Sequence, residues 1–153
     1  MPRFNHMELT LPQGSLDAGA LRDDIKRFYG EVFGFTAMDT QVVGQNALLL
    51  ATDPDVSQFI LLTQMQNPMQ SPSYDHLGFL YESRAEVDEL LEKCRKIQAQ
   101  DARVQLKTYP DLDTGGMLVH AFYVKYLLPI WFDVQCFDYK AGAAKPPRAW
   151  RYS

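Results

Sequence analysis

The feature of this sequence that most constrains its fold is an internal repeat. Residues 1–67 and residues 74–139 each show the pattern of one strand, one helix and then three strands. The two halves also open alike, because FNHMEL and YDHLGF both place a histidine third, after an aromatic residue and a small polar residue. Repetition of a whole unit indicates two copies of one supersecondary module. We therefore predict an α+β fold that contains two βαβββ modules in a single domain, residues 1–139.

The elements are predicted from periodicity and from end signals. Residues 3–12 alternate with period two and end at Pro12, which is typical of a strand. Residues 21–35 carry apolar side chains at helical spacing and include Gly34, a typical C-terminal stop. The helix of the second half, over residues 84–100, follows Ser83, which we expect to be its N-cap. A proline-containing loop joins the two halves.

Composition excludes several classes of protein. Hydrophobic residues make up 46% of the 153 residues and charged residues 22%, which is typical of a globular domain. No apolar run approaches the roughly 20 residues that a membrane span requires, so we expect no membrane partner. The net charge of −4 argues against nucleic acid as a partner. The two cysteines are too few for a disulfide framework and indicate reduced thiols in a cytoplasmic protein.

The C-terminal tail, residues 140–153, differs from the rest of the chain in charge. Its cations are Lys140, Lys145, Arg148 and Arg151, and it contains no acid. The tail therefore carries +4, which leaves −8 on residues 1–139. Pro146 and Pro147 prevent it from continuing a helix or a central strand. Two alternatives stay open: an undocked C-terminal segment, or an arm that docks Trp150 and Tyr152 on an acidic body or a neighbouring subunit.

One carboxylate stands in an otherwise apolar segment near the end of the chain. The segment FYVKYLLPIWFDVQCF, residues 122–137, is rich in aromatic and β-branched residues and contains one acid, Asp133. A charge in a buried strand is costly unless it is paired or bound to a metal ion. We therefore expect a partner for Asp133 elsewhere in the chain.

Taken in order, these segments resemble the vicinal oxygen chelate superfamily, also called the glyoxalase/bleomycin resistance protein/extradiol dioxygenase superfamily. The resemblance extends over residues 4–139 and depends on four segments: FNHMEL, LRDDIKRFYGEVFGF, DHLGFLYESRAEVDELLEK and FYVKYLLPIWFDVQ. It implies that the modules form a cupped mixed β-sheet, with flanking helices, around a divalent metal ion. It also implies ligands from the first strand of each module and from the last strand. By position these ligands are His6, His76 and Asp133.

The chain departs from the family pattern at the proposed ligands. Asp133 stands where the family normally has Glu, and Leu61 stands where glyoxalase-like members have a fourth ligand. Two histidines and one carboxylate remain, a set that suits Fe(II) with open coordination positions. Mn(II), or Zn(II) with water, fits the same set. The family's DPDG turn is replaced here by YLLP, residues 126–129.

Three further residues are candidates for catalytic roles. Glu8 lies two residues after His6, so it faces the same way on a strand; it is a general base, a partner of an imidazole, or a rim carboxylate in solvent. Tyr123 matches a substrate-contacting tyrosine of extradiol dioxygenases. His120 is near but has the opposite strand parity, so it lies near the site only if a bulge intervenes, and otherwise on the outer face or the rim.

The resemblance implies a metal-dependent enzyme that acts on a small oxygenated or aromatic molecule. Dioxygenase-like chemistry is the first choice because three ligands remain. The alternatives are a metal-dependent lyase or isomerase of the glyoxalase type and a non-catalytic protein that binds a small molecule, as resistance proteins of this fold do. We also expect a homodimer, because two-module members commonly pair and because exposed sheet edges are normally covered. Aromatic residues, 12% of the chain, are numerous enough to line both a cup and a contact.

Overall fold

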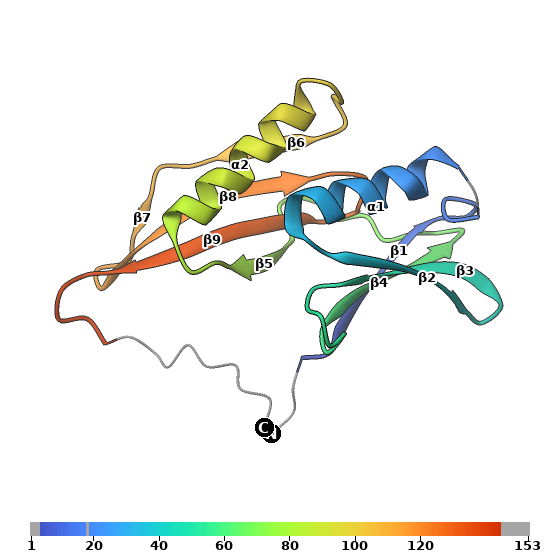
Figure 1. Cartoon of the computed structure of the whole chain (residues 1–153), viewed down its shortest axis with the longest axis horizontal. Helices are drawn as coiled ribbons and strands as arrows, with labels where there is room; N and C mark the ends of the chain where they lie inside the picture. Colours follow the sequence, from blue (N-terminus) through green and yellow to red (C-terminus); the bar gives the residue numbers. More distant parts are fainter. Residues whose placement is uncertain (1–3, 18, 145–153) are drawn as a thin grey trace.

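The computed structural model describes residues 4–17 and 19–144. Module one contains β1 (His6–Pro12), α1 (Ala20–Phe33), β2 (Thr36–Val42), β3 (Gln45–Ala51) and β4 (Phe59–Met65) (Figure 1). Module two contains β5 (His76–Leu80), α2 (Arg84–Gln98), β6 (Gln105–Thr108), β7 (Leu112–Asp113), β8 (Met117–Lys125) and β9 (Trp131–Tyr139). The expected α+β fold of two βαβββ modules is confirmed, with the short strand β7 as an addition.

Both predicted helix ends are confirmed by local hydrogen bonds. At the start of α2 the backbone N–H of Ser83 donates to Glu86, and the backbone N–H of Glu86 donates to the Ser83 hydroxyl, which is a capping box. At the end of α1, Gly34 adopts a left-handed conformation with φ of 71°, which costs glycine little. Its backbone N–H donates to the carbonyl of Gly30 at 3.0 Å.

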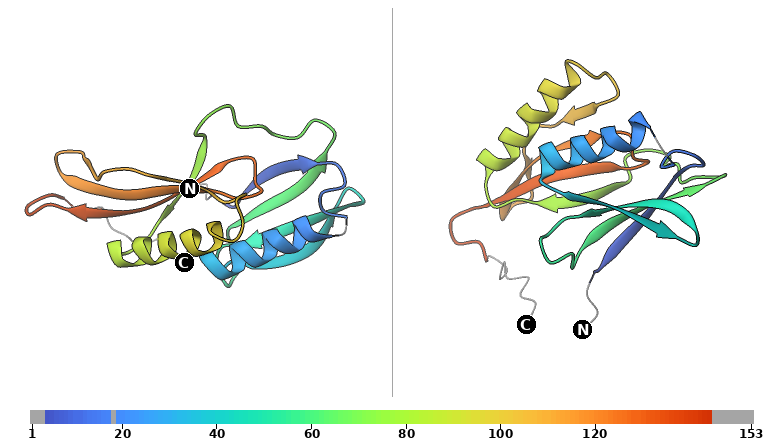
Figure 2. Two further views of the ribbon diagram at one scale, coloured as in Figure 1. Left: turned by 90° about the horizontal axis from the view of Figure 1, so that it is seen from above. Right: turned by 45° about the vertical axis from the view of Figure 1, so that its right-hand side comes forward.

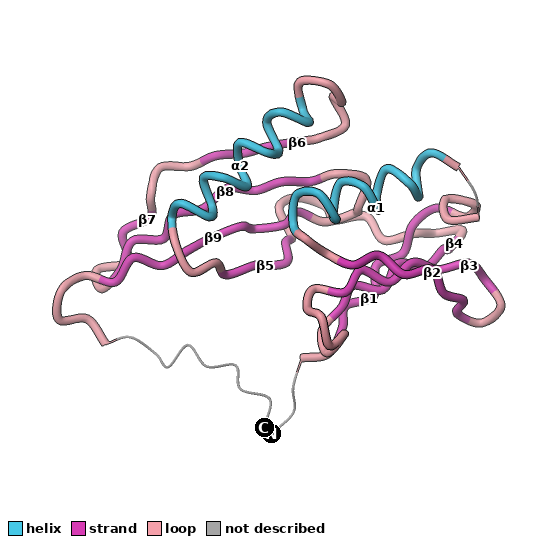
Figure 3. Tube along the Cα trace, in the orientation of Figure 1, coloured by secondary structure: helices cyan, strands magenta, loops and turns pink. Residues whose placement is uncertain are grey.

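The strands form two hydrogen-bonded sheets. The first sheet has the order β1-β4-β3-β2, and the second has the order β5-β9-β8-β6, with β7 paired to β8. In each sheet the first strand of the module runs parallel to the last one, and the other pairs are antiparallel. Figures 2 and 3 show that α1 and α2 lie on the same side of the sheets. The sheet faces that point away from the helices are called the open faces below.

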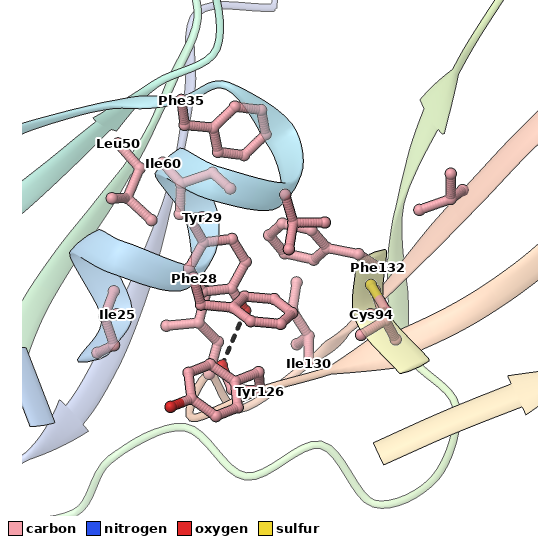
Figure 4. Close-up of a cluster of buried hydrophobic side chains, with 14 of the residues drawn as sticks. Ile25, Phe28, Tyr29, Phe35, Leu50, Ile60, Cys94, Tyr126, Ile130 and Phe132 are labelled. Carbon is pink, nitrogen blue, oxygen red and sulfur yellow. Dashed lines mark hydrogen bonds between the residues drawn. The ribbon is translucent and has the colours of Figure 1, made fainter. Parts of the chain in front are cut away.

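The core extends across the boundary between the modules. Residues of α1 in module one pack against module two, with the Phe28 and Tyr126 ring centroids 4.4 Å apart and those of Tyr29 and Phe132 5.1 Å apart. The Tyr29 hydroxyl donates to the Tyr126 carbonyl at 2.8 Å, the bond drawn in Figure 4. All four side chains are buried. Helix α1 therefore belongs to the core of both modules.

A polar cluster beside this core also joins the modules. The Arg103 guanidinium donates to Asp24 of α1 and to Asp101, at 2.6 Å in each case. The Tyr126 hydroxyl donates to Asp101 at 2.8 Å. The hydrogen bond from Arg103 is the largest cause that lowers the pKa of both carboxyls below the ordinary value. Arg103 thus fixes α1 relative to the loop that follows α2.

The chain continues past β9 for a short described stretch. Lys140 pairs with Asp113, with 2.7 Å between Nζ and Oδ1. The remainder of the basic tail, residues 145–153 with Trp150 and Tyr152, lies outside the described residues. In the described ranges, neither helix has the length and apolar character needed to cross a membrane.

We predict that Arg103→Met destabilises the fold at neutral pH, because Asp24 and Asp101 each lose the donor that lowers their pKa most and keep only Arg27 and Tyr126. The folded pKa values of Asp24 and Asp101 are lowered, so this stabilisation is present above the ordinary value of 3.8 and is lost as the pH falls through the lowered values. Urea unfolding at about pH 7 measures the destabilisation, and a series from about pH 5 to about pH 2 follows how the difference between wild type and variant declines. Arg95→Met is the control, because Arg95 pairs with Glu92 on the exposed face of α2. Equal losses for the two variants would contradict the prediction.

Candidate functional site

Asp133 lies at the centre of the open face of the second sheet. The register places it between Gly78 of β5 and Tyr123 of β8. Gly78 carries no side chain that could cover the carboxylate from that strand. The Asp133 side chain is buried, and its Oδ1 has no hydrogen-bond partner within the described part of the chain. Burial raises the pKa of Asp133, and the neighbouring His76 offsets this in part. A buried carboxylate oxygen of this kind needs a partner, which an ion, a water molecule or a second chain can supply.

His76 is oriented with one ring nitrogen towards Asp133. Its Nε2 lies 3.8 Å from Asp133 Oδ2, and its Nδ1 lies 2.8 Å from the carbonyl oxygen of Tyr74. A carbonyl oxygen only accepts, so Nδ1 must carry the proton that it donates. In the neutral ring, Nε2 then carries a free lone pair beside the Asp133 carboxylate. Metal-binding histidines have this arrangement, in which the distal N–H donates to an oxygen.

His6 has the same arrangement on the open face of the first sheet. Its Nδ1 lies 2.8 Å from Asn5 Oδ1, and the Asn5 amide nitrogen donates to the Ser57 carbonyl at 3.0 Å. The bond to Ser57 orients the amide so that its oxygen faces the ring. The His6 ring stacks on Phe59 with centroids 4.9 Å apart. His6 therefore also offers a free Nε2 when its ring is neutral.

The structure brings together two of the three expected ligands. His76 and Asp133 share one open face, whereas His6 lies on the other sheet. Among residues 4–17 and 19–144 there is no group of three or more His, Cys, Asp or Glu side chains placed to hold a metal ion. One described chain thus presents His76 and Asp133 in one place and His6 in another.

Glu8 lies on the same open face as His6. The Thr63 hydroxyl of β4 donates to Glu8 Oε1 at 2.7 Å, which fixes the direction of the carboxylate. The register places Glu8 opposite Leu61, and the two parallel strands present both side chains on one face. Glu8 is exposed, and the bond from Thr63 orients its carboxylate. It lies near His6 and not beside Asp133.

Tyr123 belongs to the surroundings of Asp133. Its ring stacks on His76 with centroids 5.1 Å apart, and Tyr109 meets it edge-on at 5.4 Å. Burial is the largest cause that raises the pKa of Tyr123, followed by the charge of Asp133. The hydroxyl is therefore protonated at neutral pH and can donate to a ligand oxygen.

His120 lies on the opposite face of the second sheet, towards α2. Its Nδ1 is 2.8 Å from Asp111 Oδ1, and its Nε2 is 2.9 Å from Asp88 Oδ1. Arg84 completes this cluster, with Nη1 2.9 Å from His120 Nδ1. The structure does not bring His120 together with Tyr123 or Asp133, because successive residues of a strand point to opposite faces.

The site also contains residues that the sequence analysis did not identify. Asn5 orients His6, and its place before the histidine in FNHMEL was a visible signal. Asp75 precedes His76 in the same way, but it does not orient that ring: the Tyr74 carbonyl accepts the hydrogen bond from His76. The pairing of β6 with β8 brings Lys107 beside Tyr123, and Tyr74 and Tyr109, just outside strands β5 and β6, contact Lys107; the sequence carries no local pattern for these contacts.

A groove of about 580 Å³ lies between the two modules. Its walls are mainly aromatic and aliphatic side chains, among them Phe4, Phe59, Phe79 and Leu80. None of the expected ligand residues lines it.

Comparison with known proteins identifies the family of this chain. Residues 23–123 match the model of the Glyoxalase/Bleomycin resistance protein/Dioxygenase superfamily. The chain belongs to this superfamily. The resemblance inferred from the sequence is thereby confirmed. Among curated protein sequences, no relative matches the chain.

Solved structures of this superfamily share the fold at low sequence identity. A possible glyoxalase from Bacillus cereus has 21% identity and a TM-score of 0.56 over 88% of this chain and 98% of that one. A domain from Frankia sp. EAN1pec has 18% identity and a TM-score of 0.58 over 93% and 95%. A mutant of the fosfomycin resistance protein FosX from Listeria monocytogenes, complexed with Mn(II) and 1S,2S-dihydroxypropylphosphonic acid, has 15% identity and a TM-score of 0.59 over 88% and 91%.

We predict that His6 and His76 carry their proton on Nδ1 when their rings are neutral, because each Nδ1 faces an oxygen acceptor. Nitrogen NMR of the metal-free protein distinguishes the two tautomers. Asn5→Ala is the matched variant: it removes the acceptor of His6 alone, so the tautomer of His6 is expected to shift while that of His76 stays. Protonated Nε2 on both rings in the wild-type protein would contradict the assignment.

Proposed function

We propose that this chain is a subunit of a metal-dependent enzyme that acts on a small oxygenated or aromatic molecule. The observation that carries the proposal is Asp133 Oδ1, a buried carboxylate oxygen with no hydrogen-bond partner in the described residues. A buried carboxylate in this condition costs stability unless a cation compensates it. The free Nε2 of His76 lies 3.8 Å from Oδ2, the other oxygen of the same carboxylate, so a divalent metal ion would fit both side chains.

The proposed ligands are His6, His76 and Asp133. Two neutral imidazoles and one carboxylate suit Fe(II), Mn(II) or Zn(II), and they leave coordination positions for a substrate. Such an ion polarises a bound oxygen and stabilises negative charge that develops on it. Leu61, at the fourth ligand position of the family, offers no donor, and this favours dioxygenase-like chemistry as the first choice.

The ligand set requires a second copy of the chain, so we propose a homodimer. His6 lies on the first sheet, away from His76 and Asp133 of its own chain. Strands β1 and β5, which carry the two histidines, are both edge strands of their sheets. Exposed edges are normally paired or covered, and two-fold symmetry would bring β1 of each protomer to module two of its partner. Each dimer then holds two sites, with His6 supplied across the interface.

The remaining residues of the chain have proposed roles in binding and proton transfer. Glu8 would enter the site together with His6, and its bond from Thr63 holds one oxygen so that the other can take a proton from the substrate. The protonated Tyr123 hydroxyl would donate to a substrate oxygen beside Asp133. Nothing in the placement of His120 supports a role with these residues.

Two other functions remain as alternatives. A metal-dependent lyase or isomerase would use the same three ligands, and the FosX structure with Mn(II) has the same fold. A non-catalytic binding protein would hold a small molecule without metal. We propose no role with nucleic acid, since the net charge is −4. The cytoplasm is the proposed location, because Cys94 and Cys136 are both free and buried.

Metal content tests the proposal directly. We expect untagged protein to contain one divalent ion per chain, and His76→Ala or Asp133→Asn to lower the affinity for it by at least about tenfold. His120→Gln is the matched control, because it removes a histidine from the opposite face of the same sheet. Elemental analysis and Mn(II) titration make the measurement. Unchanged Mn(II) affinity in the His76 and Asp133 variants, with their fold intact, would exclude this site.

Subunit mixing tests whether the site spans two chains. Co-expression of His6→Ala and His76→Ala chains should restore up to about a quarter of the wild-type metal content, because half of the dimers are mixed and one of their two sites is complete. If all ligands came from one chain, mixing would restore nothing. Metal analysis of the co-purified dimers gives the answer, and light scattering of the wild-type protein at micromolar concentration tests the dimer itself.

A further inference from the structure

Lys107 occupies an unusual position on the open face of the second sheet. Its ammonium lies 3.8 Å from the centroid of the Tyr74 ring and 5.1 Å from that of Tyr109. Both distances are within the range of cation–π attraction. The register pairs Lys107 with Tyr123, and Tyr123 with Asp133. Lys107, Tyr123 and Asp133 therefore lie in one row across β6, β8 and β9.

The ammonium of Lys107 has no acidic partner in the described part of the chain. Among the described residues, no carboxylate oxygen lies within 4 Å of its ammonium, whereas Lys26, Lys93 and Lys140 each pair with an acid. The neighbouring tyrosines, Tyr74 first and Tyr109 second, raise the pKa of Lys107. The ammonium is therefore charged at neutral pH and lies against both rings.

The surroundings of Lys107 supply the other groups that an oxyanion needs. Tyr109 meets Tyr123 edge-on at 5.4 Å, and Tyr74 lies 6.4 Å from it, so three phenol rings lie near one another and two of them contact the ammonium. Phenol hydroxyls donate hydrogen bonds to anionic oxygens, and such bonds are stronger than those between neutral groups. The rings also offer flat apolar surfaces on which an aromatic molecule can stack.

The spacing of the strands sets the size of a ligand that could use both ends of the row. Lys107 and Asp133 are two strands apart, which corresponds to about 10 Å between their backbones. Tyr123 stands between them on the same face, so a single ring with a polar group at each end would lie over the Tyr123 side chain to reach both. A ring that chelates an ion beside Asp133 would place its opposite substituent near Lys107.

We propose that Lys107, with Tyr74, Tyr109 and Tyr123, forms an oxyanion subsite that selects aromatic substrates carrying a carboxylate or a similar anionic group. The inference deepens the proposed function and depends on it only for the metal-binding end of the substrate. The anion-binding end depends on residues of one chain and needs no metal ion.

Matched pairs of ligands test the anion-binding end and the metal-binding end of the site separately. Benzoate and benzamide differ in charge but not in shape, so they report the subsite in metal-free protein. By calorimetric titration we expect the wild-type protein to bind benzoate about tenfold more tightly than benzamide, since hydrogen bonds to charged groups exceed neutral ones by that order. Lys107→Met should bring the two affinities within about twofold, whereas Lys107→Arg should retain most of the preference. Lys96→Met, which removes a charge from the exposed face of α2, should change neither affinity.

A second pair of probes shows which proposal fails. Dihydroxybenzoate and catechol share a metal-chelating group and differ in the carboxylate, so Mn(II) should tighten both and Lys107→Met should weaken dihydroxybenzoate alone. If Mn(II) tightens neither but the benzoate preference depends on Lys107, the metal proposal fails and the subsite stands. If wild-type protein shows no preference for benzoate, or if folded Lys107→Met keeps it, the subsite is overturned.

Discussion

The packing of α1 against both modules is the contact on which the rest of the structure depends. Phe28 and Tyr29 of module one contact Tyr126 and Phe132 of module two. The Tyr29 hydroxyl donates a hydrogen bond to the Tyr126 carbonyl. Neither module could bury these aromatic faces alone, because each sheet has only one helix to cover it. The shared helix places α1 and α2 on one side and leaves both open faces uncovered. The candidate site residues other than His120 lie on those faces.

The chemistry of the open faces follows from groups that the fold leaves incomplete. Asp133 is buried without a partner for Oδ1, and His76 and His6 each commit one ring nitrogen to an oxygen acceptor. Lys107 is held between two rings without a counter-ion in the described residues. Asp133 is buried, so leaving its charge uncompensated costs stability that a metal ion can restore. His6, His76 and Lys107 are accessible to solvent and offer a lone pair or a charge to a ligand. The proposals for the metal, the dimer and the oxyanion subsite all start from groups that are incomplete in one chain.

Much of the fold could be predicted because its signals are local. Period-two alternation puts His6 and Glu8 on one face of β1 and Leu9 in the core, and the structure agrees. Ser83 and Gly34 terminate helices through bonds to residues close in sequence. Strand alternation also predicted that His120 and Tyr123, three residues apart, point to opposite faces of the sheet. Strand β7 was missed because two residues carry no periodicity.

The sequence by itself determined the repeat, the order of the elements other than β7, the family, and the facing directions of Glu8 relative to His6 and of His120 relative to Tyr123. These depend on local spacing and on the duplicated FNHMEL and YDHLGF segments. Only the tertiary structure decided that His76 lies beside Asp133 while His6 stays apart, and that Lys107 reaches the ring of Tyr74. Strand pairing and the packing of α1 set these distances. They are sums over many weak contacts between residues far apart in sequence, so no short segment encodes them.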